Sequence, residues 1–401
     1  MSQRQQPLWT KSFVALTLSA FLLFLNLQMM VAAFPSYAKN EFQANDVTVS
    51  LVTSLFALAA IAARFITAGL MGRLGQKTLL YAGLAISVAT TGIYVLASTI
   101  GSLLLMRIGF GIGFGMASTI VPTLVSSLIP SGRMGEGIGY FGLSASLAMS
   151  IGPMIGLNVM KGAGFGALSA VAAVTLILSW PLLMLSGVLK GDGASSASDV
   201  RAASKGKPAF NRKLLFPAAL NVLLAITYGG VLSFIALFGE SVRLEQVGLF
   251  FLFNAATIIL VRPISGKLFD RKGHAVVLLP AACFIVASMT VLSYATTMPM
   301  LIVSALLYGL GFGAIQPTLQ AWMLRASSPE QYGMANSMFY NSTDLGVAIG
   351  AFALGYISAA AGYGPMYRFS AGFMILFLVG YAIVQWRPGR ASRREAPRIW
   401  S

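Results

Sequence analysis

The sequence predicts an all-α membrane protein in which twelve transmembrane helices form two pseudo-symmetric six-helix bundles. Three observations lead to this prediction: the composition, a series of apolar segments of spanning length, and an internal repeat. Of the 401 residues, 57% are hydrophobic and 9% are charged, whereas soluble proteins carry about 25% charged residues. The mean hydropathy is +0.80. The composition therefore argues against a soluble enzyme.

Apolar segments long enough to cross a bilayer, which takes about 20 helical residues, recur along the whole chain. Each is expected to be helical, because backbone polar groups in hydrocarbon must be satisfied within the segment. The first is too long for the apolar region of a signal peptide and is predicted to be a retained helix. The predicted spans cover about 12–34, 48–71, 78–98, 100–128, 137–160, 165–188, 214–239, 245–266, 275–295, 299–324, 333–358 and 365–386.

One long polar connection interrupts this series. Residues 189–213 are rich in Gly, Ala, Ser and Lys, a composition typical of a mobile linker. The predicted domains are an N-terminal six-helix bundle over 1–188, a cytoplasmic linker over 189–213, a C-terminal six-helix bundle over 214–386, and a basic cytoplasmic tail over 387–401.

The basic residues orient the chain. Lys and Arg number 27 against 11 Asp and Glu, giving a net charge of +16. With the N-terminus inside, only Lys39, Lys161, Arg243 and Arg368 fall outside, which is a strong positive-inside signal. We therefore expect a multi-pass protein of the cell inner (cytoplasmic) membrane with both termini cytoplasmic, and no nucleic-acid partner.

The residue counts also limit the chemistry. A single cysteine, Cys283, excludes disulfides within the chain, and a single histidine, His274, excludes a multi-histidine zinc site. No metal and no other cofactor is expected. No phosphate-binding GxxxxGK followed by Ser or Thr is present, and no nucleophile–base pair of enzymatic type is visible, so neither an ATP-driven pump nor an enzyme is predicted.

The two halves of the chain resemble each other at a shift of 198 residues. RFITAGLMGRLG at 64–75 aligns without gaps on RPISGKLFDRKG at 262–273, and GFG at 113–115 aligns on GFG at 311–313. Such a duplication is typical of transporters built from repeats, with the substrate site between the halves near the bilayer midplane.

The segment GKLFDRKG at 266–273 resembles the signature of the loop between the second and third helices of each half in the major facilitator superfamily. The first-half copy is degraded, since Ala68 and Gly72 replace its leading glycine and its aspartate. The resemblance implies the major facilitator fold. It also implies a gating latch that forms across the halves in one state and separates in the other, although the basic residues could instead only hold the topology. The latch residues are Arg73, Gly75, Lys77, Gly266, Asp270, Arg271 and Gly273.

The predicted fifth span carries small residues and a proline that resemble the antiporter signature of the drug/proton exchangers in this superfamily. Ala148 and Leu157 depart from the pattern at two glycine positions. Small residues let two helices approach closely, so the opposed half could close against this helix. Ordinary small-residue packing is the alternative. The motif residues are Gly139, Gly152, Pro153 and Gly156.

Three charged residues are candidates for proton coupling. Arg107 resembles the arginine of the family's fourth helix that is associated with coupling, and it is expected to face a polar cavity or an acidic partner. The alternative is that Arg107 only anchors its helix to helix-end carbonyls or extends outward to the membrane surface. Asp344 is the only acidic residue deep within a predicted span. Burial favours the protonated carboxyl and a nearby arginine favours the charged form, so Asp344 could relay a proton, or could simply pair with Arg107. Glu240 is the reserve candidate.

By the same resemblance, a set of polar residues on the predicted helices should line the substrate cavity. Lipid would disfavour each of them, although packing is an alternative for any single one. They are Asn26, Gln28, Asn158, Asn221, Tyr228, Asn254, Gln316, Gln320, Tyr340 and Asn341.

The resemblance thus implies a secondary active transporter that exports small molecules, such as drug-like or amphiphilic compounds, by proton antiport with alternating access. Segment 341–350 is also similar to the eleventh helix of bacterial multidrug and opine-metallophore exporters. The expected partners are a small-molecule substrate, protons and the lipid bilayer, with the monomer as the functional unit. Alternatives are a dedicated metabolite or metallophore exporter, an uptake symporter, a transporter-like receptor and a lipid flippase.

Overall fold

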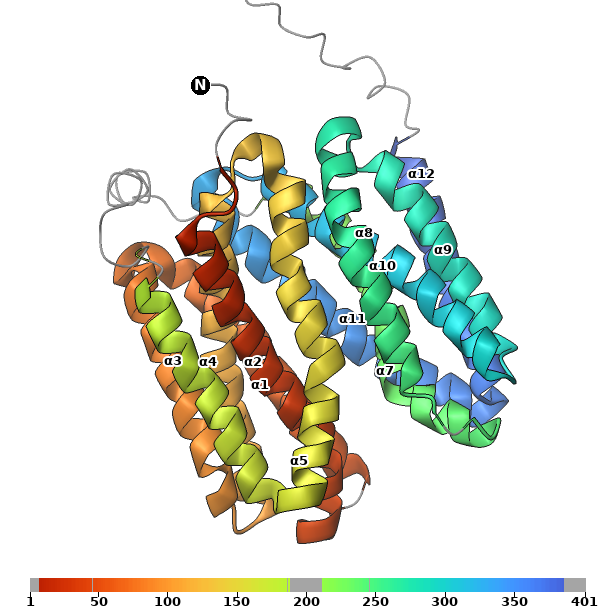
Figure 1. Ribbon diagram of the computed structural model, residues 1–401, viewed down its shortest axis with the longest axis horizontal. Helices are drawn as coiled ribbons and strands as arrows, with labels where there is room; N and C mark the ends of the chain where they lie inside the picture. The colour runs from red at the N-terminus through yellow and green to blue at the C-terminus, as the bar shows by residue number, and fades with distance from the viewer. Residues whose placement is uncertain (1–6, 45, 186, 188–210, 245, 386–401) are drawn as a thin grey trace, which may run out of the picture.

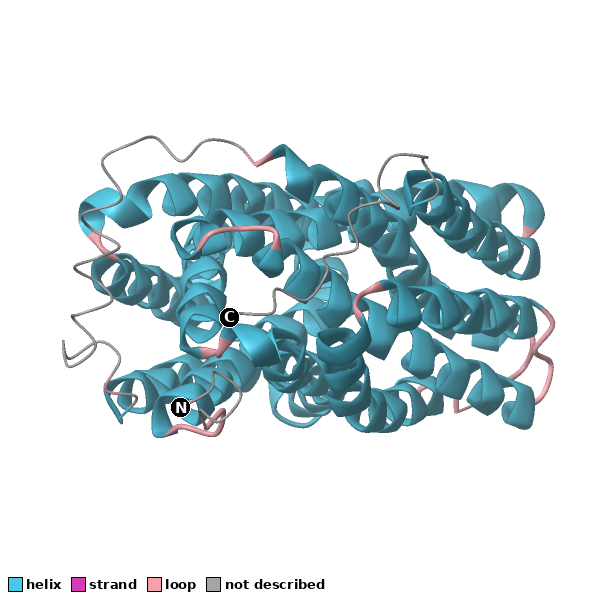
Figure 2. Cartoon of the chain, turned by 90° about the horizontal axis from the view of Figure 1, so that it is seen from above, coloured by secondary structure: helices cyan, strands magenta, loops and turns pink. Residues whose placement is uncertain are grey.

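The computed structural model describes residues 7–44, 46–185, 187, 211–244 and 246–385. Within these ranges every regular element is a helix, and twelve segments are long and apolar enough to cross a membrane (Figure 2). The predicted fold class is confirmed. The helices are α1 (Lys11–Phe42), α2 (Asp46–Leu74), α3 (Gln76–Ile93), α4 (Ile100–Leu128), α5 (Met134–Leu185), α7 (Leu215–Ser241), α8 (Leu249–Lys272), α9 (Ala275–Ser293), α10 (Met298–Arg325), α11 (Tyr332–Ala361) and α12 (Tyr363–Gln385), with short 3-10 turns η2 (Tyr94–Leu96), η3 (Ser131–Arg133), η4 (Arg212–Leu214) and η5 (Pro329–Gln331).

Helix α5 contains two of the predicted spans. Its helical backbone is interrupted at Gly164, where φ is +82°. A residue with a β-carbon rarely adopts that conformation, whereas glycine does so without steric cost. Gly164 therefore ends the fifth span and lets the chain turn directly into the sixth.

Two glycines at matching places in the repeat have the same backbone conformation. Gly75 follows α2 with φ +77°, and Gly273 follows α8 with φ +82°. Both positions favour glycine because left-handed backbone strains other residues. The alignment of Gly75 with Gly273 thus reflects the same helix termination in each half.

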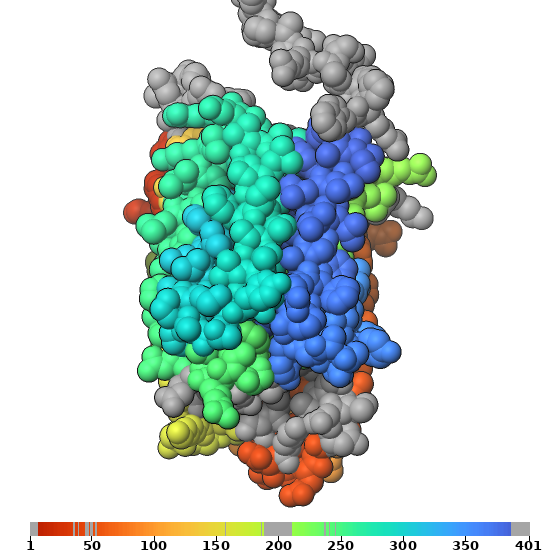
Figure 3. Space-filling model, turned by 90° about the vertical axis from the view of Figure 1, so that its right-hand side faces the viewer, coloured from red at the N-terminus to blue at the C-terminus, as the bar shows by residue number. Residues whose placement is uncertain are grey.

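The described helices pack as two groups, α1–α5 and α7–α12 (Figure 1). Contacts between the groups come mainly from α2 and α4 against α11, and from α5 against α8 and α10. Figure 3 looks onto the second group, whose helices cover the viewer's side of the molecule. The start of α1 and the end of α12 lie at the same end of the molecule (Figure 1), called here the terminal end. The predicted tail 387–401 and residues 189–210 of the predicted linker lie outside the described residues.

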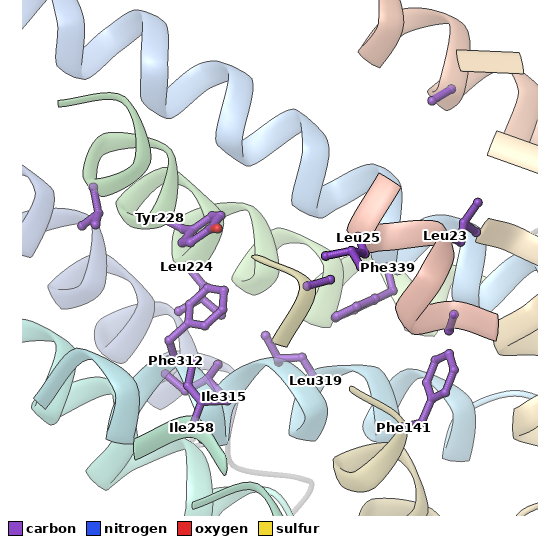
Figure 4. Close-up of a cluster of buried hydrophobic side chains, with 14 of the residues drawn as sticks. Leu23, Leu25, Phe141, Leu224, Tyr228, Ile258, Phe312, Ile315, Leu319 and Phe339 are labelled. Carbon is purple, nitrogen blue, oxygen red and sulfur yellow. The ribbon is translucent and has the colours of Figure 1, made fainter. Parts of the chain in front are cut away.

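The interior is mostly apolar and aromatic. Tyr228 of α7, Ile258 of α8 and Phe312 of α10 lie close together in Figure 4, and the Tyr228 and Phe312 rings stack with centroids 5.1 Å apart. Three arginines, Arg64, Arg107 and Arg262, are nevertheless among the largest fully buried side chains. A charged side chain inside a membrane helix is costly, so these three arginines mark candidate functional positions.

Candidate functional site

An ion pair joins the two helix groups through α2 and α11. The Arg64 Nη1 atom lies 2.5 Å from the Asp344 carboxylate and donates a second hydrogen bond to Asn341 Oδ1 at 3.1 Å. Its Nε donates to Ser118 Oγ of α4 at 3.2 Å. The Arg64 side chain is 1% exposed, whereas that of Asp344 is 30% exposed. The cation is thus enclosed, while the carboxylate is partly exposed.

Aromatic rings surround this pair. The Arg64 guanidinium carbon lies 5.8 Å from the Phe114 ring centre and 5.7 Å from that of Tyr340, distances at which a cation is attracted to a ring face. Phe24 of α1 packs against both rings. The Arg64–Asp344 pair lies about ten residues from the terminal end of α2, or about 15 Å, which is near the middle of a 30 Å hydrocarbon core.

A second polar contact crosses the groups nearer the terminal end. The Asn336 Nδ2 of α11 donates to Ser126 Oγ of α4 at 3.2 Å, and Asn336 Oδ1 accepts from Gln320 Nε2 of α10 at 2.9 Å. Gln320 thus contacts α11 rather than an open cavity.

The prediction for Arg107 was wrong in its surroundings. Arg107 is fully buried and, among the described residues, forms no ion pair with an acidic side chain. Its Nε donates to the Val52 carbonyl at 3.0 Å, and its guanidinium lies 4.5 Å from the ring centres of both Phe34 and Phe56. Asp344 therefore pairs with Arg64 and not with Arg107, because α11 packs on α2 and leaves Arg107 among the rings of the first group.

The repeat relates the contact between α5 and α8 to the contact between α2 and α11. In the α5–α8 contact the arginine is kept, but no acidic residue pairs with it among the described residues. Arg262 aligns with Arg64, and its Nη2 donates to Gln316 Oε1 at 2.7 Å, just as Arg64 binds Ser118 at the position aligned with Gln316. The guanidinium lies against Gly142, where an added β-carbon would come within 1.9 Å of Nη1. The residue aligned with Asp344 is Ser146. Within the described chain no carboxylate forms an ion pair with Arg262.

At the terminal end, the predicted latch residue Asp270 joins the groups. Its carboxylate accepts hydrogen bonds from the backbone amides of Gly135 and Glu136, both at 2.9 Å, and pairs with Arg325 of α10. The amides belong to the start of α5, where free N–H groups and the helix dipole favour an anion. Glu136 pairs in turn with Arg133 at 2.8 Å and with Lys267 at 3.6 Å.

The other latch residues divide into two kinds. Gly266 allows close approach of α8 and α5, since a β-carbon there would come within 2.4 Å of the Gly135 carbonyl oxygen. Arg73, Lys77 and Arg271 are exposed, and in the described part of the chain they form no ion pair.

The small residues of the fifth span serve two different contacts. Gly139 faces the Arg262 backbone of α8 across the groups, whereas Gly152 and Gly156 face Gln28 and Met29 of α1 in the same group. Pro153 lies inside α5 without ending it. Only the first part of the motif therefore meets the opposed group.

A small, partly open pocket lies between α5 and the second group, lined by Ser146, Met149, Ser150, Tyr228, Phe251, Asn254, Ile258 and Phe312. Of the polar residues predicted to line a cavity, the structure brings Tyr228 and Asn254 to this pocket. Tyr340 and Asn341 surround Arg64, and Gln316 binds Arg262.

The remaining polar candidates lie elsewhere. Asn26 donates to the Ala172 carbonyl at 2.7 Å, and Asn221 donates to Phe339, Ser342 and Thr343 of α11, so each ties helices of its own group together. Gln28 packs on Gly152, and Asn158 is exposed. The side chain of Glu240 lies outside the described residues. Among those described, no cluster of His, Cys, Asp or Glu could hold a metal ion.

Two residues at the centre of the site, Arg64 and Arg262, were not singled out from the sequence as site residues. The signal was present, because both are cations within predicted spans and align in the repeat. A cationic side chain inside the membrane is energetically costly. Its presence at the same position in both halves therefore marks that position as a candidate site.

Comparisons with known proteins agree with this architecture. The sequence profile of the Major Facilitator Superfamily matches residues 16–320 and 246–399. The chain belongs to this superfamily. It is therefore a multi-pass membrane protein of a transporter family and not an enzyme.

Named relatives span nearly the whole chain. An MFS-type transporter of Methanocaldococcus jannaschii is 23% identical over 91% of this chain and 96% of the relative. The staphylopine export protein of Staphylococcus aureus is 19% identical over 89% and 92%, and the multidrug resistance protein MdtG of Escherichia coli is 24% identical over 98% and 97%. The crystal structure of the human organic anion transporter MFSD10 superposes with a TM-score of 0.76 at 15% identity, covering 95% of this chain and 99% of that one.

Proposed function

We propose that this major facilitator protein exports small molecules across the cytoplasmic membrane in exchange for protons, by alternating access. The observation that carries the proposal is the Arg64–Asp344 ion pair, which joins the two helix groups inside the membrane. Two relatives along the whole chain are named as an export protein and a multidrug resistance protein, which supports export of small molecules.

The partial exposure of Asp344 would make the ion pair respond to protonation. A charged Asp344 attracts Arg64 and holds α11 against α2, whereas a protonated Asp344 has no charge to offer. A proton that reaches the 30% exposed carboxyl therefore weakens the contact between the groups and favours their separation at the terminal end. Loss of that proton on the other side restores the pair.

The terminal end is proposed to be cytoplasmic, with both termini inside. Exposed Arg73, Lys77, Arg271 and Lys272 lie at helix ends on that side, consistent with the positive-inside rule. The conformation described here is then the one with the cytoplasmic gate closed by Asp270 on α5. Since one chain supplies both groups and the pocket between them, the monomer is proposed to be the functional unit.

One proton moving inward through 100 mV supplies about 2.3 kcal/mol, which corresponds to roughly a fiftyfold gradient of a neutral substrate. Proton-driven exchange is therefore measurable in liposomes with an imposed pH gradient. We expect the purified protein to transport substrate against the substrate's concentration gradient. The compounds to be tested are ethidium, a neutral dye and an aromatic carboxylate.

The Asp344→Asn variant tests the relay. It keeps the shape of the side chain and removes the titratable carboxyl, so proton-driven exchange should fall at least tenfold while downhill flux persists. Glu330→Gln makes the same acid-to-amide change at an exposed site and should leave exchange unchanged. Unimpaired proton-driven exchange in Asp344→Asn would remove the carboxyl from the mechanism, and accumulation in the direction of the proton gradient would indicate a symporter.

A further inference from the structure

We infer that Tyr340 is a positioning residue that links the two cross-group contacts, α2 with α11 and α5 with α8, so that protonation of Asp344 loosens both. The inference rests on the proposed function and adds the route by which one carboxyl acts on two contacts. Asp344 pairs with Arg64 in the first contact only. Both contacts must nevertheless part if the helix groups are to separate at the terminal end.

The ring of Tyr340 belongs to the first contact. Tyr340 lies one turn before Asp344 on the same face of α11. Its ring centre is 5.7 Å from the Arg64 guanidinium carbon, a distance at which a ring face attracts a cation. The ring also packs against Phe24 of α1, with the ring centres 5.9 Å apart. Tyr340 is therefore packed against the cation that Asp344 holds.

The hydroxyl of Tyr340 connects to the second contact. It lies within electrostatic range of Arg262 of α8 as well as of Arg64. The Arg262 guanidinium lies against Gly142 of α5 and forms no ion pair within the described chain. Hydroxyl dipoles orient in the field of nearby charges, so the phenol oxygen stabilises a buried cation that lacks a carboxylate.

Two glutamines of α10 join the same two places. Gln316 Oε1 accepts a hydrogen bond from Arg262 at 2.7 Å. Gln320, one turn further along, interacts with the Tyr340 hydroxyl and donates to Asn336 Oδ1 of α11 at 2.9 Å. Residues four apart lie on one face of a helix. The same polar row of α10 therefore contacts both Arg262 and Tyr340.

Proton binding to Asp344 starts the proposed sequence of changes. Arg64 loses its charged partner and moves away from α11 as the groups part, so the Tyr340 ring loses the cation packed on it. The side chain can then turn, which takes its hydroxyl away from Arg262. Arg262 is 1% exposed, and a buried charge that loses a stabilising partner is strongly unfavourable. The α5–α8 contact is therefore weakened in the same transition as the α2–α11 contact.

Tyr340→Phe tests this route, because it keeps the ring beside Arg64 and removes only the hydroxyl. Distances between spin labels are measured in the purified full-length protein at one pH, with one label pair for each contact and with Cys283 replaced by serine. The pairs, all at exposed positions near the terminal end, are Leu74 with Ser328 for α2–α11 and Ser131 with Lys272 for α5–α8.

Tyr340→Phe should add a longer component to the α5–α8 distance distribution and leave the α2–α11 distribution unchanged. Asp344→Asn should lengthen both distances. The double variant should lengthen the α5–α8 distance no further than Tyr340→Phe alone, since both changes act through one hydroxyl. Proton-driven exchange should fall at least fivefold in Tyr340→Phe while downhill flux persists.

The matched control is Tyr367→Phe, which removes the hydroxyl of a buried tyrosine of α12 that packs against Phe238. Its distances and its exchange rate should match those of the parent. An unchanged α5–α8 distance in Tyr340→Phe would overturn the inference, as would additive lengthening in the double variant. Lengthening of both distances in Tyr340→Phe would indicate a general loosening of packing and would overturn it too.

These outcomes are separable from the proposed function, because the distance measurements need neither a substrate nor a proton gradient. If Asp344→Asn lengthens only the α2–α11 distance, the two contacts are independent and the link is removed, while the exporter proposal stands. Absence of proton-driven flux in the native protein would instead remove the exporter proposal itself.

Discussion

The three buried arginines in the described part of the chain have different surroundings. Arg64 has a carboxylate, Arg107 has a backbone carbonyl between two aromatic rings, and Arg262 has a neutral amide. A carboxylate can be neutralised by a proton, whereas a carbonyl and ring faces cannot. Protonation of Asp344 would therefore weaken the Arg64 contact and would leave the Arg107 contact unchanged.

His274 makes a residue-scale prediction about pH. Its ring stacks on Trp322 at 4.0 Å and its Nδ1 lies 2.6 Å from the Tyr381 hydroxyl. Burial lowers the pKa of His274 below its usual value, because desolvation disfavours the charged imidazolium. The unfolded chain, with a histidine pKa of about 6.5, then binds the proton more readily than the folded chain.

The stabilisation from neutral His274 is therefore complete above about pH 6.5 and is lost as the pH falls through the lowered pKa of the folded state. The apparent unfolding temperature of the native protein, measured between pH 7.5 and pH 5.0, should fall more steeply than that of His274→Phe. Phenylalanine keeps a ring against Trp322 and cannot be protonated. Parallel curves for the two proteins would show that other groups cause the loss.

At the scale of elements, the two cross-group contacts are built differently. Helices α5 and α8 meet backbone to backbone, where Gly266 faces Gly135. In the α2–α11 contact the aligned residues are Ala68 and Gly333, and a β-carbon on Gly333 would meet the flexible side chain of Met71. The first contact is therefore rigid and intolerant of added atoms, and the second can adjust.

Gly266→Ala should accordingly open the terminal end. The added methyl group would overlap the Gly135 carbonyl, so α8 must move away and the Asp270 carboxylate loses its hydrogen bonds to the start of α5. Spin labels at Ser127 and Lys272, on α4 and α8, should report longer and broader distances in this variant.

The matched control for that measurement is Gly69→Ala. The same methyl group is added there to α2, where an added β-carbon would have nothing within 4 Å. The distance distribution should match the parent, in which Cys283 is replaced by serine to leave only the two labels. An unchanged distribution in Gly266→Ala would mean that the glycine contact does not hold the gate.

At the scale of the whole molecule, the main contacts between the groups run from the terminal end to about the middle of the bilayer. Asp270 lies at that end, and the Arg64–Asp344 pair lies about 15 Å deeper along α2. The pocket begins beyond Arg262, on the side away from the gate. This arrangement predicts that the pocket communicates with the outer face of the membrane.

Cysteine labelling measures that access. Ser150→Cys, in the pocket, should react with a membrane-impermeant maleimide added to right-side-out vesicles and should resist it in inside-out vesicles. Adding Asp344→Asn removes the ion pair and should raise the labelling rate from the inner face several-fold. Equal labelling of Ser150→Cys from both faces without that second substitution would contradict a closed cytoplasmic gate.

The amino-acid sequence by itself was enough to predict the helical membrane fold and the twelve spans, because spanning length and apolar composition are local properties of a segment. It was also enough for the repeat, and with it the kind of transporter, since duplicated residues align without knowledge of their contacts. It indicated that Asp344 and Arg107 are unusual, because ionisable groups inside spans are costly wherever they point.

Only the tertiary structure decided which groups meet. Asp344 binds Arg64, which is 280 residues away, and the helix periodicity of α11 cannot say which helix packs against its polar face. The same holds for Asp270, whose partners are backbone amides at the start of α5. Almost every residue type has a backbone amide, so the sequence cannot show that these two bind the carboxylate. Pairing across the two groups depends on how whole helices pack, and that packing is set by many weak contacts summed over their length.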